Sequence, residues 1–156
     1  MTTTSTVLLL SGPNLNLLGE RDPAVYGTAT LADHVATAEA AAVSAGLELE
    51  HLQSNHEGVI VDAIHAARGR CVAIIINPAA LTHYAWSLHD ALDAFDGPVV
   101  ELHISNPKER EPWRHLSVVE PVADRTIAGF GGDGYRLAVE AVAELLESPQ
   151  ARGDGR

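Results

Sequence analysis

Two uninterrupted apolar runs limit what this 156-residue chain can fold into. Residues 7–10 read VLLL and residues 71–76 read CVAIII, so neither run leaves a polar face for solvent. Strands of this kind need cover on both faces, which is typical of the central strands of a parallel sheet between two layers of helices. The two runs therefore predict an α/β fold.

Helix-like segments alternate with strand-like segments along the chain. Two of the helices begin at residues with capping-box spacing, Thr30 with Asp33 and Ser54 with Glu57. Two later helices carry apolar residues on one face. The predicted helices cover residues 31–46, 57–69, 83–95 and 135–146, and the predicted strands cover residues 6–11, 47–53, 71–76, 98–104 and 126–130.

Five strands with helices between them predict a flavodoxin-like, doubly wound five-stranded parallel sheet, because parallel neighbours require crossover connections. We expect residues 1–149 to form this single domain and residues 150–156 to form a disordered tail. Ligands of such folds bind beyond the carboxyl ends of the strands, so we expect the functional site at that edge.

Net charge, cysteine content and the first residues limit which kinds of partner the protein can bind and indicate its cellular compartment. The formal net charge of −11 disfavours binding to nucleic acid or to an anionic membrane. Cys71 is the only cysteine, so no intrachain disulfide forms. The opening MTTTSTVLLLSG lacks the basic flank and the apolar length of a signal peptide or membrane span, which predicts a cytoplasmic protein.

Polar residues fall at the ends of the predicted central strands. Asn14 follows the first strand, Asn77 follows the third, and Glu101 and His103 share one face at the end of the fourth. A carboxylate beside an imidazole fixes the orientation of the ring and favours its protonated form. The alternative interpretation of this pair is a structural ion pair at a strand end.

A long loop at residues 12–27, GPNLNLLGERDPAVYG, follows the first strand. Loops of this length are usually lids, binding loops or disordered connections. Tyr26 in this loop can act as a base only as a phenolate, which a nearby cation favours. Arg21 in the same loop and Arg114 after the fourth strand are the candidate cations, although a solvated connection remains the alternative.

Other motifs do not indicate a cofactor or metal. Residues 129–134, GFGGDG, match GxGxxG, but no later strand carries a ribose-binding acid, so we interpret them as a packing turn. No HExxH motif or cysteine cluster predicts a metal site. Lys108, the only lysine, lies beside Glu109 in a loop and is a poor candidate for a Schiff base. We therefore expect no cofactor.

Six segments spread along nearly the whole chain form one further pattern: residues 12–27, QSNHEG at 53–58, INPAA at 76–80, VELHISN at 100–106, REPWRH at 110–115 and GxGGxGY at 129–135. In their sequence and their order, these segments resemble the type II 3-dehydroquinate dehydratases, or type II dehydroquinases. The resemblance implies a cofactor-independent lyase of the shikimate or quinate pathway. Its reaction would be the trans-dehydration of 3-dehydroquinate to 3-dehydroshikimate through an enolate. It also implies a homo-oligomer, a dodecamer built as a tetramer of trimers.

The resemblance implies a role for each candidate catalytic residue. Tyr26 would remove a proton from C2 of the substrate, with Arg21 keeping it ionised, and Asn14 would hold a water that stabilises the enolate. His103, paired with Glu101, would be the general acid for the departing C1 hydroxyl. These roles agree with elementary chemistry, since proton removal beside a ketone needs a base, and loss of hydroxide needs an acid.

The resemblance also implies substrate contacts. Asn77, His83 and Arg114 would hold the ring hydroxyls, the backbone at Ile104 and Ser105 would bind the carboxylate, and Asp90 would reach into the site of the neighbouring subunit.

One segment departs from the family pattern. Where the family often has INPAAYTHTS, this chain has INPAALTHYAW, and we expect Leu81, Tyr84 and Trp86 to alter the wall around His83.

Two readings from other classes remain open. One is a non-catalytic flavodoxin-like module that binds a phosphate or nucleotide through its glycine-rich loops, which would not need Tyr26 and His103 together. The other is a purely structural oligomer, which leaves the polar groups at the predicted edge without a role.

Overall fold

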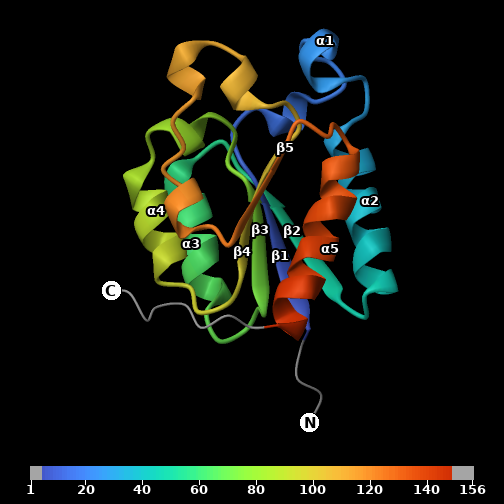
Figure 1. Cartoon of the computed structure of the whole chain (residues 1–156), viewed down its shortest axis with the longest axis vertical. Helices are drawn as coiled ribbons and strands as arrows, with labels where there is room; N and C mark the ends of the chain where they lie inside the picture. Colours follow the sequence, from blue (N-terminus) through green and yellow to red (C-terminus); the bar gives the residue numbers. More distant parts are fainter. Residues whose placement is uncertain (1–4, 149–156) are drawn as a thin grey trace.

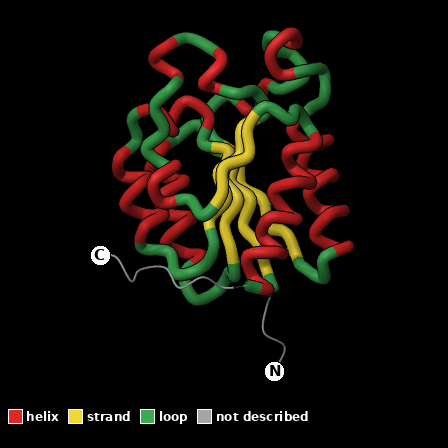
Figure 2. Tube along the Cα trace, viewed as in Figure 1, coloured by secondary structure: helices red, strands yellow, loops and turns green. Residues whose placement is uncertain are grey.

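A single five-stranded parallel sheet forms the centre of the molecule. The computed structural model describes residues 5–148, and the expected tail at 150–156 lies outside this range. The strands are β1 (Thr6–Ser11), β2 (Glu48–Gln53), β3 (Ala73–Asn77), β4 (Val99–His103) and β5 (Arg125–Ala128). Their order in the sheet is β2-β1-β3-β4-β5, which confirms the predicted flavodoxin-like topology (Figure 2).

Two pairs of helices cover the two faces of the sheet (Figure 1). Helices α2 (Leu31–Ser44) and α5 (Asp133–Glu147) pack on one face. Helices α3 (Glu57–Ala67) and α4 (Trp86–Asp93) pack on the other. Side chains of β1 alternate between the two cores, with Leu9 toward α2 and α5 and Leu8 toward α3 and α4. Burial of both faces explains why the central strands carry no polar face.

Short helices line the carboxyl ends of the strands. The segment predicted as a long loop contains η1 (Leu15–Leu17) and α1 (Pro23–Tyr26). The polar segment after β4 contains η3 (Pro107–Glu109) and η4 (Pro112–Arg114). The next short helix, η5 (Glu120–Val122), instead packs beside α4 and leads into the start of β5. In Figure 1, α1 and the amber segment after β4 stand together at the top of the view, above the sheet.

Most predicted boundaries differ from the observed ones by no more than about two residues, and two of the differences have a visible cause. β3 begins at Ala73 rather than at residue 71, because the Cys71 amide still bonds to the Ala67 carbonyl at the end of α3, at 2.8 Å. The helix predicted at 83–95 is divided into η2 (Ala79–His83) and α4, since Tyr84 and Ala85 adopt non-helical backbone angles.

One of the two predicted capping boxes forms. The Thr30 hydroxyl accepts from the Asp33 amide at 3.2 Å, and the Asp33 carboxylate accepts from the Thr30 amide at 2.9 Å. The prediction at residues 54–57 is wrong. The Ser54 hydroxyl instead accepts from the His56 amide, two residues on, at 3.0 Å, and the Glu57 carboxylate accepts from the Ser87 hydroxyl of α4. Short polar side chains often bond to nearby backbone in this way and form a turn in place of a cap.

The glycine-rich segment at 129–134 is a turn against which other elements pack. A Cβ atom on Gly132 would lie 2.8 Å from Cε1 of His34, and one on Gly134 would lie 3.0 Å from Cδ1 of Leu102. Close approach of neighbouring side chains therefore explains these glycines. Among the helices of residues 5–148, none combines the length and the apolar character needed to cross a membrane.

Candidate active site

A pocket lies at the carboxyl ends of β1, β3 and β4, where the topology predicts ligand binding. It has about 510 Å³ of space between protein atoms, part of it open to solvent. Nine residues that the sequence singled out line it: Asn14, Arg21, Tyr26, Asn77, His83, His103, Ile104, Ser105 and Arg114.

The start of the loop that carries Asn14 is held by the end of β2. The Asn14 amide donates to Oδ1 of Asn55 at 3.0 Å, and Asn14 has a left-handed backbone with φ of 69°. Nε2 of Gln53 donates to the Gly12 carbonyl at 3.2 Å and to the same Asn55 oxygen at 3.1 Å. Hydrogen bonds from the segment QSNHEG therefore fix the position of Asn14 at the pocket.

Two arginines converge on the hydroxyl of Tyr26. Nη1 of Arg110 donates to it at 2.9 Å, and Nη2 of Arg21 donates to it at 3.3 Å, with the Arg21 guanidinium 4.5 Å from the ring centre. Arg110 also lies 3.4 Å from the hydroxyl of Ser105, and its carbonyl accepts from the His115 ring at 3.0 Å. A phenolate at this position accepts two charge-assisted hydrogen bonds.

The sequence analysis did not select Arg110. The signal was present, since Arg110 belongs to the same polar segment as Arg114. Tyr26 and Arg110 are 84 positions apart, and nothing in the sequence indicated that the two side chains meet.

His103 and Glu101 form a buried pair at the base of the pocket. Nε2 of His103 donates to Oε2 of Glu101 at 2.6 Å, and Glu101 is 1% exposed. Burial alone would raise the pKa of the Glu101 carboxyl, but hydrogen bonds from His103, Thr82 and Ser117 hold it below its ordinary value. Glu101 does not line the pocket and lies behind His103, so it supports the imidazole without reaching a ligand there.

Two further side chains on the pocket wall each have one polar atom bonded to the backbone, which determines whether the other atom donates or accepts. Nδ1 of His83 donates to the Leu116 carbonyl at 2.7 Å, and burial lowers the pKa of His83, so its other ring nitrogen is an acceptor at neutral pH. Oδ1 of Asn77 accepts from the Ala79 amide at 3.2 Å, which leaves the Asn77 amino group to donate.

Arg114 reaches the pocket from η4. Its guanidinium lies 4.0 Å from the ring centre of Trp113, and its Nε donates to the Glu111 carboxylate. The Trp113 ring also meets the His83 ring edge-on, with centroids 5.5 Å apart. Trp113 therefore contacts both the Arg114 guanidinium and the His83 ring, which places the cation beside His83.

Five of the selected residues, Glu101 among them, do not line the pocket. Asp90 is exposed on α4 and does not line it. Leu81, Tyr84 and Trp86 do not line the pocket either, because Leu81 packs in the core beside α3 and α4 and the other two side chains are more than half exposed. Their effect on the wall around His83 stays a prediction. Within residues 5–148, no group of three or more histidine, cysteine, aspartate or glutamate side chains is placed to hold a metal ion.

The family model and the relatives that match this chain all carry names of the same enzyme family. The family model described as "Dehydroquinase class II" matches residues 5–143. The 3-dehydroquinate dehydratase 2 of Pseudomonas putida is 52% identical over 145 residues, covering 93% of this chain and 97% of the relative. The catabolic 3-dehydroquinase of Aspergillus oryzae is 51% identical over 146 residues, covering 94% and 95%.

Solved structures agree with the sequence relatives. The type II dehydroquinase of Butyrivibrio crossotus superposes with a TM-score of 0.87 at 40% identity, over 90% of this chain and 99% of that one. The type II dehydroquinase of Propionibacterium acnes has a TM-score of 0.86 at 40% identity, over 92% and 99%. Because the family model and these relatives span nearly the whole described fold and its pocket, the chain belongs to the class II dehydroquinase family.

Proposed function

We propose that this protein is a lyase that dehydrates 3-dehydroquinate to 3-dehydroshikimate, the activity for which its relatives are named. One observation carries the proposal. A tyrosine hydroxyl held by two arginines and an imidazole backed by a buried carboxylate line the same pocket. This is the base and acid pair that loss of water beside a ketone requires.

In the proposed mechanism, the Tyr26 phenolate takes the proton from C2 next to the ketone, and the electron pair moves into an enolate. Asn14 holds a water that donates to the enolate oxygen. The His103 imidazolium then gives a proton to the C1 hydroxyl, the C1–O bond breaks, and the enolate electrons form the C1–C2 double bond. Water leaves, and solvent returns the proton from Tyr26 to His103.

The pocket wall offers groups for the rest of the substrate. The proposal assigns the ring hydroxyls to Asn77, His83 and Arg114, and the substrate carboxylate to the backbone of Ile104 and Ser105. The amino group of Asn77 and the acceptor nitrogen of His83 support this assignment, because together they provide a donor and an acceptor for hydroxyl groups.

We also propose that the active form is a dodecamer built as a tetramer of trimers, with Asp90 at the site of a neighbouring subunit. Four large exposed side chains near His83 support a subunit contact: Tyr84, Trp86, Trp113 and Leu116, each more than half exposed. Contiguous exposed apolar side chains of this size usually mark an interaction surface.

An assay with 3-dehydroquinate tests the activity, with absorbance of the conjugated enone product as the signal. Titration with FMN and nucleotides tests the alternative of a non-catalytic binding module. Enone formation without nucleotide binding supports the lyase, whereas nucleotide binding without enone formation supports the alternative.

A second assay tests the proposal that no cofactor takes part. We expect activity to survive EDTA, and borohydride added with substrate to leave the enzyme active. Covalent trapping of substrate on Lys108 would contradict the proposed mechanism.

A further inference from the structure

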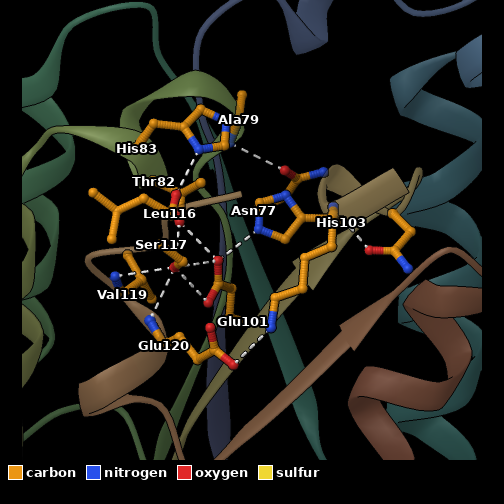
Figure 3. Close-up of polar contacts among 12 residues, drawn as sticks. Asn77, Ala79, Thr82, His83, Glu101, His103, Leu116, Ser117, Val119 and Glu120 are labelled. Carbon is orange, nitrogen blue, oxygen red and sulfur yellow. Dashed lines mark hydrogen bonds and ion pairs between the residues drawn. The ribbon is translucent and has the colours of Figure 1, made fainter. Parts of the chain in front are cut away.

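Two hydroxyl groups from distant segments meet at the carboxylate of Glu101, on the side away from the pocket (Figure 3). Oγ1 of Thr82, in η2, donates to Oε2 of Glu101 at 2.7 Å. Oγ of Ser117, between η4 and η5, lies 3.0 Å from Oε1 and 2.9 Å from Oε2. Together with His103 at 2.6 Å, they surround a carboxylate that is 1% exposed.

Hydrogen-bond donors surround the carboxylate. The Ser117 hydroxyl accepts from the amides of Val119 at 3.2 Å and Glu120 at 3.0 Å, so it uses its single proton to donate. The Thr82 hydroxyl lies 2.8 Å from that of Ser117 and 2.7 Å from Oε2 of Glu101. This arrangement favours the ionised carboxyl group, in line with the lowered pKa of Glu101.

The ionised carboxylate decides which nitrogen of His103 can serve the reaction. Nε2 of His103 must carry a proton, because it lies 2.6 Å from a group that only accepts. The other ring nitrogen is then the one that exchanges a proton with a ligand.

Resting on the proposed function, we infer that Thr82 and Ser117 are positioning residues for the acid step. They hold Glu101 as a carboxylate, which accepts the Nε2 proton of His103 and keeps the ring correctly oriented for departure of the hydroxyl. Neither side chain needs to touch the substrate, and neither was selected from the sequence.

Variants that remove one hydroxyl test this role. Thr82→Val keeps the branched shape and removes the donor, and we expect kcat to fall about ten- to a hundredfold with little change in KM, as for loss of a hydrogen bond to a charged group. The pH profile of kcat should also change, because the carboxylate that accepts the Nε2 proton of His103 has lost a donor. Ser117→Ala should act in the same direction, and Thr82→Ser should restore most of the rate and the profile.

The control is Thr126→Val. Thr126 pairs with Glu101 in the register of β4 and β5 and lines the same cavity behind it, but its hydroxyl does not bond to Glu101. This variant should match the wild type. Circular dichroism confirms that each variant is folded.

A measurement without turnover separates this inference from the proposed function. In protein labelled with ¹⁵N-histidine, the His103 ring proton on Nε2 should resonate far downfield, be absent in His103→Gln, and move upfield in Thr82→Val. An unchanged resonance and an unchanged pH profile in folded Thr82→Val would overturn the role of Thr82. Equal losses in Thr126→Val would also overturn it. If the wild type forms no enone, the proposed function fails, while the resonance still reports whether the hydroxyls hold the carboxylate ionised.

Discussion

The hydroxyl of Tyr26 receives hydrogen bonds from two arginines that reach it from different loops. Arg21 comes from the loop that also carries Tyr26, and Arg110 comes from the segment after β4. At this residue scale, the arrangement makes separate predictions for the base and for the cations that surround it.

Removal of the Tyr26 hydroxyl should abolish proton removal from C2. In Tyr26→Phe we expect dehydration to fall by a factor on the order of 10² to 10⁴, the usual contribution of a general base. Exchange of the C2 proton with deuterated water, followed by NMR and corrected for enzyme-free exchange, should also disappear. His103→Ala is the matched control, since it should block dehydration and still permit some exchange. Exchange above background in Tyr26→Phe would show that another group is the base.

Loss of either arginine should slow the chemical step. Arg21→Gln and Arg110→Gln should each lower kcat at least about tenfold, because a charge-assisted hydrogen bond to the phenolate disappears. Steady-state kinetics measures the effect. The control is Arg136→Gln, because Arg136 is an exposed arginine that forms ion pairs on the surface of α5. A change confined to KM would mean that the arginine only binds substrate.

At the scale of secondary-structure elements, helices α2 and α5 contact each other through two stacked rings. The His34 ring on α2 lies parallel to the Tyr135 ring on α5, with centroids 4.9 Å apart and planes within 1°. Both side chains are buried, and burial raises the pKa of Tyr135 to about 12 and lowers the pKa of His34. Gly132 leaves the space that the His34 ring occupies.

The lowered pKa of His34 predicts loss of stability in mild acid. The unfolded chain binds a proton near the ordinary histidine pKa of about 6.5, whereas the folded chain binds it only at lower pH. Stability should therefore fall as the pH drops through about 6.5 toward the folded-state pKa. His34→Phe keeps a ring in the stack without a titrating group, so its urea midpoint should depend less on pH than that of the wild type. Equal pH dependence in the two proteins would contradict this assignment.

At the scale of the whole molecule, the exposed residues around His83 and the position of Asp90 bear on assembly. Asp90 is exposed on α4 and outside the pocket of its own chain, as a residue that serves a neighbouring subunit would be. The four exposed side chains Tyr84, Trp86, Trp113 and Leu116 lie on segments next to that pocket.

Mixed oligomers test whether subunits share a site. Tyr26→Phe and Asp90→Ala should each be weakly active alone. Their co-expressed mixture should recover activity, because some sites then combine a wild-type Tyr26 with a wild-type Asp90 from the other chain. Sedimentation should show a dodecamer in each case. An active monomer at assay concentrations, or no recovery in the mixture, would exclude the shared site.

The sequence by itself determined the layers of the fold. Apolar runs, helical spacing and the capping box at Thr30 depend on residues a few positions apart. They therefore predicted the parallel α/β architecture and the approximate bounds of most helices and strands. Polar residues at strand ends were predicted to meet at one edge, because parallel strands bring their carboxyl ends together. Nine of the selected residues do line one pocket there.

Only the tertiary structure decided which side chains meet beyond those strand ends. Arg110 reaches Tyr26 across 84 residues, and Thr82 and Ser117 reach Glu101 across 19 and 16 residues. The capping box expected at Ser54 failed for a related reason, because Glu57 found a partner on another helix. Local patterns report interactions within about one turn of helix or one strand pair, whereas these contacts depend on how loops pack above the finished sheet.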